Sequence, residues 1–523
     1  MRKSTLPSIL AACLALSACG TNPVTGDTEL QLISQSQEIQ IGQQNYAPTR
    51  QSQGGDLTVL PELTTYVNQV GQKLAAVSER RLPYEFTVLN SSVPNAWALP
   101  GGKIAVNRGL LTALDNEAEL AAVLGHEIVH AAARHGAQAQ ERGMLLQAGM
   151  IAASIGVGMS DLDPNLGNLL VGGASVGAQL VAMRYGREAE LEGDLYGMRY
   201  LKAAGYDPMA AVTLQEKFVR LSEQEGRGQD GWLEGLFASH PPSQERVEAN
   251  RRTAAKLGAG GELGAERYAA NMAPLRKVQP AYDRYDEAIK AAQKKDYDGA
   301  RRLALSAAKE FPRESRFQQL LGDLEMAGKH PDRAIDYFEK AASLDPGYFG
   351  PYLRGGIAYY RNDDRSKAEA WLNQSNELLP TAPAHYYLGM IAKETGNTQQ
   401  ALEHFRTAAG SQSEIGKKAA AEFAALDVAG NPGQYLATAG QLDAQGRVVL
   451  RVQNRAPFAL RDIVVTPVMI DGSGRIVQEG RSLNIGRVLQ SGEQVSLDAG
   501  IGAMPADRLP FLRFRIDGAR PAS

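Results

Sequence analysis

Apolar side chains recur at helical spacing over two stretches in the first half of the chain. Between Asn116 and Gln140 no proline interrupts the pattern, and Asn116 followed by Glu119 makes a capping box that marks a helix start. From Arg184 to Leu201 a second apolar set falls on one side of a helix. The two sets are Leu120, Val123, Leu124 and Val129, then Leu191, Leu195, Met198 and Leu201. We therefore expect one continuous helix across each stretch.

Shorter elements are expected ahead of the first of these helices. The chain from Glu29 to Val77 favours helix around a linker at Gln51–Asp56. Tyr84–Asn90 alternates between apolar and polar residues, and Lys103–Val106 is a second short strand pattern. Helices and strands together predict an α+β region.

The stretches Met144–Met159 and Leu166–Met183 are apolar and rich in Gly, Ala and Met. Each is at or below the length that crosses a bilayer as a helix. We favour a buried or lid-like helical hairpin over 144–183, which could gate a site. A membrane-associated hairpin is the alternative.

From about Tyr282 the chain repeats itself. Small residues and prolines recur at intervals of 33 or 34 residues, which is the tetratricopeptide pattern of paired helices. The recurring positions are Ala300, Ala334, Ala368 and Ala401, then Pro312, Pro346 and Pro380, then Gly322, Gly356 and Gly389. About four helix pairs would stack into a curved array, which favours a docking surface over a spacer.

After a Gly/Pro break at 430–433, strand-like alternation appears in three runs that begin at Val448, Ile463 and Phe511. Short strands separated by turns predict a small β-sandwich. The chain is thus expected to be multidomain and mostly α. The predicted segments are 1–18 (N-terminal leader), 19–56 (N-terminus of the mature chain and entry helix), 57–255 (α+β domain), 256–280 (linker), 281–428 (repeat array) and 434–523 (β-sandwich).

The first residues resemble a bacterial lipoprotein signal. Two basic residues precede an apolar run that ends in Leu16-Ser-Ala-Cys19. This pattern implies cleavage before Cys19 and acylation of its thiol, which would anchor the mature protein in a membrane. No Asp follows Cys19, which by analogy favours the outer membrane and a periplasmic location. A secreted protein cut nearby is the alternative.

Composition narrows the possible chemistry. A net charge of −3 gives no reason to expect a nucleic-acid partner. Cys13 and Cys19 are the two cysteines of the chain, so neither a disulfide framework nor a cysteine metal ligand is available in its body.

Candidate metal ligands lie on the helix expected at 116–140. His126 and His130 are one turn apart, so both imidazoles leave the same face and can reach one Zn²⁺ ion. Glu127 would lie beside the metal, where its carboxylate can take a proton from a water molecule. This is the H-E-x-x-H pattern of zinc peptidases. Two exposed histidines and a surface glutamate are the alternative.

A third ligand is expected on the second helix. Glu190 and Asp194 share one face, which suits a ligand and a partner for the outer N–H of a ligating histidine. For Glu188 and Glu192 a solvated acidic face is favoured. The extended pattern with a third histidine needs Gly at position 133 and His at 136, where the chain has Ala and Gly. His135 is therefore interpreted as a structural or helix-end residue.

The pairing of His126-Glu-Ile-Val-His130 with Arg187-x-x-Glu190-x-x-Gly-Asp194 resembles metallopeptidase family forty-eight, which includes the CAAX prenyl protease and BepA-type proteases. The likeness covers about residues 22–255 and implies that the α+β domain expected at 57–255 is a gluzincin-type zinc peptidase domain. One departure is Gly193, where the family usually has Ala; it removes no ligand.

Two further segments carry the resemblance. Asn95-Ala96-Trp97-Ala98 begins a segment that in the family lines the substrate cleft as an edge strand. An extended peptide could add to that edge through main-chain hydrogen bonds. Ser239–Val247 resembles the family's later His-Pro segment, in which the His can cap the zinc and the Arg faces the cleft. His240 and Arg246 are thus expected near the metal, as cap or oxyanion partner and as stabiliser of the tetrahedral intermediate.

The function expected from this pattern is that of a periplasmic, lipid-anchored zinc endopeptidase. By resemblance, its substrates would be misfolded or stalled envelope proteins, and its repeats would engage outer-membrane assembly machinery. The alternative is a chaperone or assembly adaptor whose zinc site is latent or capped.

Overall fold

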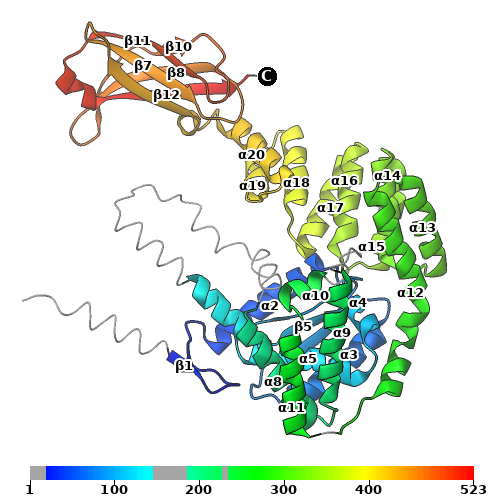
Figure 1. Cartoon of the computed structure of the whole chain (residues 1–523). Coiled ribbons are helices and arrows are strands. Elements are labelled where there is room, and N and C mark those ends of the chain that lie inside the picture. The colour runs from blue at the N-terminus through cyan, green and yellow to red at the C-terminus, as the bar shows by residue number, and fades with distance from the viewer. Residues whose placement is uncertain (1–18, 145–184, 226–233, 259, 523) are drawn as a thin grey trace, which may run out of the picture. The chain divides into compact units, whose positions relative to one another are not determined.

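The computed structural model describes residues 19–144, 185–225, 234–258 and 260–522 (Figure 1). The signal peptide expected at 1–18 and nearly all of the hairpin expected at 144–183 lie outside these residues. The described chain forms two compact units, residues 1–351 and 352–523. Among the described residues, no helix is both long and apolar enough to cross a bilayer.

The first unit opens with a hairpin and two helices and continues with a small sheet and a set of helices. Its elements up to residue 257 are β1 (Cys19–Thr21), β2 (Thr28–Leu30), α2 (Gln35–Ser52), α3 (Pro61–Ala75), β3 (Glu85–Leu89), β4 (Ala96–Leu99), β5 (Lys103–Asn107), α4 (Arg108–Ala113), α5 (Glu117–Ala132), α8 (Arg187–Ala203), α9 (Met209–Glu225), α10 (Glu234–Ser239) and α11 (Gln244–Leu257). The strands run in the order β3-β5-β4, with β3 parallel and β4 antiparallel to β5. Among the described strands, β4 is therefore an edge.

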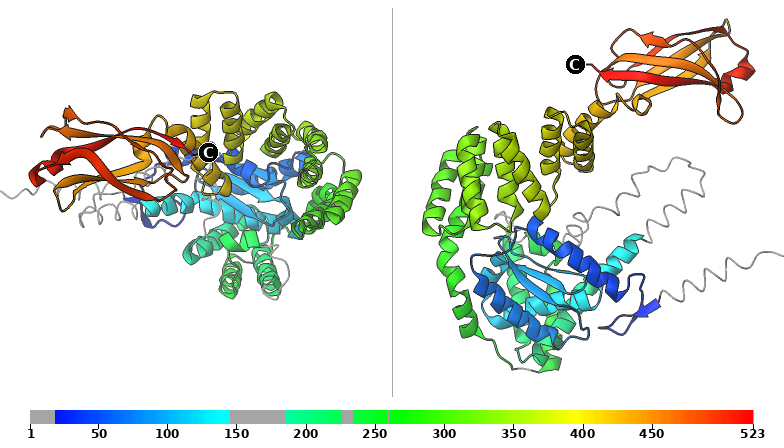
Figure 2. Two further views of the ribbon diagram at one scale, coloured as in Figure 1. Left: turned by 90° about the horizontal axis from the view of Figure 1, so that it is seen from above. Right: turned by 180° about the vertical axis from the view of Figure 1, so that it is seen from behind.

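Side chains alternate across each strand, and those on both faces of this sheet are buried. Ala96, Ala98 and Val106 belong to the main core, together with residues of α3 and α5. Trp97 and Leu99 face the other way and pack with Tyr46 of α2 in a second cluster. Figure 2 shows α2 in dark blue crossing the sheet on this face. The strand that was expected to meet substrate is thus covered on both faces.

The helix expected over 116–140 is broken in the structure. α5 ends at Ala132, and helix resumes at 135 after a turn in which Arg134 has a φ of 63°. A left-handed backbone costs a non-glycine residue about 1–3 kcal/mol. Buried ion pairs hold the turn: the Arg134 guanidinium reaches Glu38 at 2.6 Å, Glu29 at 2.8 Å and Glu141 at 3.1 Å. Periodicity cannot reveal such a break, because its cause is non-local.

α5 and α8 approach each other closely. A Cβ added at Gly125 would lie 3.2 Å from the carbonyl oxygen of Gly197, and one at Gly197 would lie 3.0 Å from the His126 nitrogen. The two glycines therefore let the backbones of the helices come within contact distance. This closeness places the histidines of α5 opposite the carboxylates of α8.

A long helix, α12 (Ala265–Gln293), follows the peptidase part and covers much of the segment expected as a linker at 256–280. The repeat helices come next: α13 (Tyr297–Glu310), α14 (Ser315–Ala327), α15 (Pro331–Leu344), α16 (Phe349–Arg361), α17 (Arg365–Leu378), α18 (Ala382–Glu394), α19 (Thr398–Ala409) and α20 (Glu414–Asp427). The boundary between the two compact units falls within α16. The expected tetratricopeptide array is confirmed, while the individual domain boundaries stay predictions.

Within the first unit, the start of the repeats packs on the peptidase part through buried polar groups. Glu314, the N-cap residue of α14, accepts hydrogen bonds from Asn90 Nδ2 at 3.0 and 3.1 Å and from the Tyr282 hydroxyl. The Arg108 guanidinium donates to Asn90 Oδ1 at 3.0 Å and lies 3.6 Å from the centre of the Tyr282 ring. This network fixes α12 and α14 against the loop that leads into β4.

The second unit ends in two sheets, as the strand pattern predicts. One has the order β10-β8-β12, with β9 added to β8, and the other has the order β11-β7-β6. The strands are β6 (Leu436–Leu442), β7 (Arg447–Asn454), β8 (Leu460–Ile470), β9 (Ile476–Glu479), β10 (Leu483–Ile485), β11 (Gln494–Ala503) and β12 (Leu512–Pro521). Inward side chains of both sheets form one core, which makes the sheets a sandwich.

Candidate metal centre

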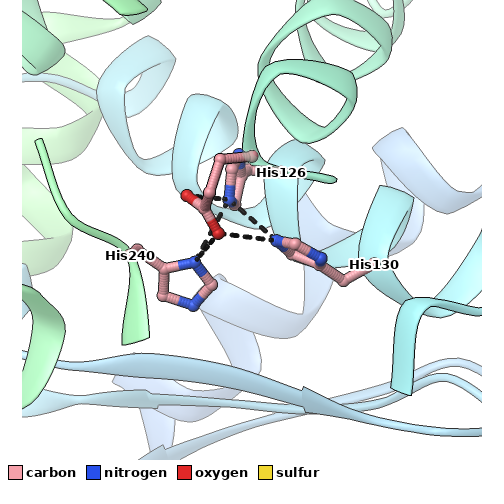
Figure 3. A group of neighbouring side chains, drawn as sticks. His126, His130 and His240 are labelled. Carbon is pink, nitrogen blue, oxygen red and sulfur yellow. Dashed lines mark hydrogen bonds and ion pairs between the residues drawn. The ribbon is translucent and has the colours of Figure 1, made fainter. Parts of the chain in front are cut away.

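Four potential ligand side chains converge where α5, α8 and the loop before α11 meet. His126 and His130 leave the same face of α5, Glu190 comes from the first turn of α8, and His240 follows directly after α10. All four are buried, and one ligand atom of each lies within 4.8 Å of those of the others. Figure 3 shows the three histidine rings turned toward a common point.

The distances within this group fit a single metal ion. His126 Nε2 lies 3.0 Å from His130 Nε2 and 3.4 Å from His240 Nδ1. Glu190 lies 2.9 Å from His240 Nδ1, 3.5 Å from His126 Nε2 and 3.6 Å from His130 Nε2. Tetrahedral ligands at zinc bond lengths of about 2.0–2.1 Å would stand ~3.4 Å apart. The donor set is also chemically suitable, because imidazole and carboxylate are common ligands of zinc.

Asp194 lies behind His126. Its Oδ1 is 3.0 Å from His126 Nδ1, the ring nitrogen turned away from the group. Burial by itself would raise the pKa of Asp194, but the charges of Arg246 and His126 and their hydrogen bonds together outweigh it and lower this pKa to about 2. The carboxylate is therefore ionised and accepts the Nδ1–H of His126, which leaves Nε2 free to face the ligand group.

Arg246 binds both carboxylates of α8. Its guanidinium donates two hydrogen bonds to Asp194, at 2.7 and 2.8 Å, and lies 2.7 Å from Glu190 Oε2. Burial by itself would raise the pKa of Glu190, but the charge of His240 and hydrogen bonds from the histidines outweigh it, so the pKa lies below its usual range. The structure thus places Arg246 as a partner of the two carboxylates.

Glu127 sits beside the group with one oxygen unsatisfied. Its Oε1 is 3.5 Å from His240 Nε2, while its buried Oε2 has no hydrogen-bond partner among the described residues. Burial raises the pKa of Glu127 above its ordinary value. A buried carboxylate oxygen without a hydrogen-bond partner destabilises the fold unless water or substrate donates a hydrogen bond to it.

A small cavity opens beside His126 and Glu127. It has a volume of about 50 Å³, and half of the side chains around it are apolar. They include Val123, Met198, Leu214, Phe218 and Leu236. Water and small apolar groups therefore both have room next to the Glu127 carboxylate.

The expected substrate segment lies in β4 and its approach. Ala96, Trp97 and Ala98 pair with β5 along one edge, and Asn95 accepts a hydrogen bond from the Asn107 backbone through its own carbonyl oxygen. These side chains are buried, as is the side chain of Asn95. Among the described strands, β4 pairs with β5 alone, so its other side has no strand partner in the part of the chain that the structure describes.

The sequence patterns did not predict two contacts that His130 makes in the structure. The ring of Tyr185 stacks on the His130 ring, with centroids 3.9 Å apart. His135, interpreted above as a structural residue, lies within hydrogen-bonding distance of His130. Tyr185 falls just before α8 with no pattern to mark it, whereas His135 could have been suspected from its position five residues after His130.

Comparison with known proteins agrees with this geometry. Residues 61–254 match the model described as Peptidase family M48, and residues 315–348 match one described as Tetratricopeptide repeat. The Metalloprotease LoiP of Escherichia coli (strain K12) is 31% identical over 189 residues, which are 36% of this chain and 67% of that protein.

Two longer relatives share one name, Beta-barrel assembly-enhancing protease. The protein of Escherichia coli (strain K12) is 25% identical over 457 residues, which are 77% of this chain and 90% of the relative. That of Yersinia pestis is 27% identical over 305 residues, 54% of this chain and 62% of the relative, so the match spans less than two thirds of it. The chain therefore belongs to Peptidase family M48 and is a metallopeptidase whose peptidase domain is followed by tetratricopeptide repeats.

Proposed function

We propose that this protein is a zinc-dependent endopeptidase that cleaves unfolded segments of envelope proteins. The observation that carries the proposal is the arrangement of three buried imidazoles and Glu190 around one point, with the unpaired Oε2 of Glu127 beside it. A structural zinc site has no use for a general base, so the retained Glu127 favours catalysis.

Each residue then has a defined task. His126, His130 and Glu190 hold the Zn²⁺ ion, which supplies Lewis-acid activation of a water molecule and of the peptide carbonyl. Glu127 takes the proton of the attacking water and later returns it to the leaving amine. Asp194 fixes the tautomer of His126. Arg246 holds Asp194 and Glu190 in place, and we retain stabilisation of the tetrahedral intermediate as its expected second role.

His240 supports a latent resting state. Catalytic zinc sites hold three protein ligands and keep a fourth position for water, yet His240 Nδ1 lies among the ligand atoms. We propose that His240 fills that position until substrate binding displaces it. The same observation favours a second candidate function, an assembly adaptor in which the site stays permanently capped.

Two features support unfolded polypeptide as the substrate. β4 pairs with β5 on one side only, so an extended peptide could add to its other side through main-chain hydrogen bonds, which bind with little regard to sequence. The cavity beside Glu127 includes apolar side chains such as Leu214 and Phe218, which suit the apolar groups that folded proteins bury and unfolded ones expose. We therefore infer a role in quality control, with Asn95, Ala96, Trp97 and Ala98 forming the substrate edge.

The names of the relatives support a place in outer-membrane protein assembly. We propose that the repeats dock on assembly machinery there, because tetratricopeptide arrays present a concave binding surface. The lipobox pattern supports cleavage before Cys19, acylation of that residue and a periplasmic protein anchored to the outer membrane. The β-sandwich is assigned a binding or positioning role.

Replacing Glu127 by glutamine tests the proposal, with Glu188→Gln as matched control because Glu188 is an exposed glutamate of α8. We expect Glu127→Gln to abolish cleavage of unfolded casein while zinc content is kept, and to trap natural substrates in cells. An adaptor would keep its cellular role in the Glu127→Gln variant. Cleavage that survives both this substitution and a chelator would refute the peptidase mechanism.

A further inference from the structure

The break after α5 turns His135 back toward the metal centre. A continuous helix would send residue 135 onto a different face from His130, since five residues correspond to well over one turn. The left-handed turn at Arg134 changes that direction, and its three ion pairs to Glu29, Glu38 and Glu141 keep it in place. A strained and buried turn of this kind indicates that the turn serves to hold a particular side chain in position.

The side chain so placed lies in a line of polar contacts. His135 Nδ1 is 2.7 Å from His130 Nδ1, and His135 Nε2 is 3.0 Å from Glu192 Oε2. Both histidines are buried, while the Glu192 side chain is about one third exposed. The contacts run from the proposed ligand His130, through His135, to a carboxylate at the surface.

Only one arrangement of protons along this line is compatible with a metal on His130. If His130 Nε2 binds the ion, its ring proton is on Nδ1, which must donate to an acceptor. His135 Nδ1 then accepts with its lone pair, so the proton of His135 is on Nε2 and is donated to Glu192. In the reverse arrangement, His130 would carry its proton on Nε2 and could not bind a metal.

We propose that His135 and Glu192 are positioning residues that fix the ring and tautomer of His130, as Asp194 and Arg246 do for His126. This inference rests on the proposed function, in which His130 Nε2 is a zinc ligand. The two ligand histidines are then supported by separate partners, one pair on each side of the site. Glu192 has a specific task and does not belong to a merely solvated acidic face.

Zinc affinity of the full chain, measured by competition with a chromophoric chelator, tests the proposal. Outer partners of ligand histidines are typically worth 10- to 100-fold in metal affinity. We expect a loss of this size in His135→Ala and about tenfold in Glu192→Gln. His135→Gln should recover most of the affinity, because an amide keeps one acceptor and one donor. Glu188→Gln, on the exposed side of α8, should bind zinc like the wild type.

The outcomes separate this proposal from the function it rests on. His130→Ala should lose zinc; if it binds zinc like the wild type, the ligand assignment is wrong and the positioning role falls with it. If His130→Ala loses zinc but His135→Ala and Glu192→Gln do not, the function stands and the positioning role is overturned. Circular dichroism of the metal-free protein shows whether His135→Ala folds. If it does not fold, the zinc affinity of Glu192→Gln decides whether the positioning role holds, because the Glu192 side chain is partly exposed and its replacement should not prevent folding.

Discussion

Replacing Glu314 by alanine would test how firmly the start of the repeat array is held on the peptidase part. The Glu314 carboxylate is buried and has three tasks at once. It caps α14 by accepting from the Arg316 backbone at 2.9 Å, and it accepts from Asn90 Nδ2 and from the Tyr282 hydroxyl. Its removal therefore weakens a helix and leaves two buried donors without an acceptor.

The cost can be worked out from these contacts. Losing the N-cap costs about 1 kcal/mol. Each buried donor left unsatisfied costs about 1–3 kcal/mol, so the whole change amounts to about 3–7 kcal/mol. Glu314→Gln keeps the shape but turns an amide N–H toward one of the donors, and we expect about 1–3 kcal/mol for it. Glu310→Ala is a matched control, because its ion pair with Arg284 is more than one third exposed and is worth 0 to about 1 kcal/mol.

Amide hydrogen exchange gives the readout. The segment 90–95 joins β3 to β4; the Asn90 amide donates to the Gly55 carbonyl oxygen at 2.8 Å, and the Gly109 amide donates to that of Ser91 at 3.0 Å, so exchange of these two amides reports whether the loop stays in place. A loss of about 3 kcal/mol raises exchange there about 100-fold, at 1.4 kcal/mol for each factor of ten. Casein cleavage should fall as well if β4 is the substrate edge that we propose, since this loop leads into it. Equal exchange in Glu314→Ala and Glu310→Ala would show that the network does not fix the loop.

Three further results are expected. Removal of zinc by a chelator should abolish cleavage and lower the melting temperature. The free energy of unfolding should fall by about 4 kcal/mol if the free zinc concentration had been 1,000 times the dissociation constant. Added zinc should restore both the cleavage and the melting temperature. His240→Ala should raise the casein cleavage rate if His240 is a removable cap; a fall to the level of Glu127→Gln would contradict that role. Burial by itself would raise the pKa of Glu117, but hydrogen bonds from Arg267 and two tyrosines outweigh it and lower this pKa. The stability that the Glu117 carboxylate adds is therefore present above its unfolded-state pKa of about 4.3 and is lost as pH falls, so the melting temperatures of wild type and Glu117→Gln should differ at pH 7 and converge in acid.

The parts of the fold that rest on short-range spacing could be predicted from the sequence. The 34-residue period reflects helix pairs that each contact only their neighbours, so one repeat carries the information for all. The spacing of His126 and His130 likewise follows from one turn of helix. The nearness of Glu190 to these histidines could be expected too, because an acidic residue on a second amphipathic helix suits the proposed ligand set.

The parts that depend on packing between distant segments could not be predicted. The Glu314 network joins residues more than two hundred positions apart in the sequence, and no local pattern marks them. Tyr185 stacks on His130 only because α8 begins beside α5. Arg246 was expected to face the cleft, and its fork to Asp194 became visible only with α8 and α11 in place.

Gly193 illustrates how a local rule and a tertiary contact can favour different residues. By helix propensity alone, alanine at this position would stabilise α8 by about 1 kcal/mol. In the structure, however, a Cβ at 193 would lie 2.6 Å from His126 Cε1 and 2.7 Å from its Nδ1, the nitrogen that contacts Asp194. The ring of His126 occupies the space that glycine leaves open, and a larger residue would have to shift the ring or the helix to fit. The departure from the family pattern is therefore tied to the placement of His126, and the weaker helix is the consequence of letting that ring come this close to α8.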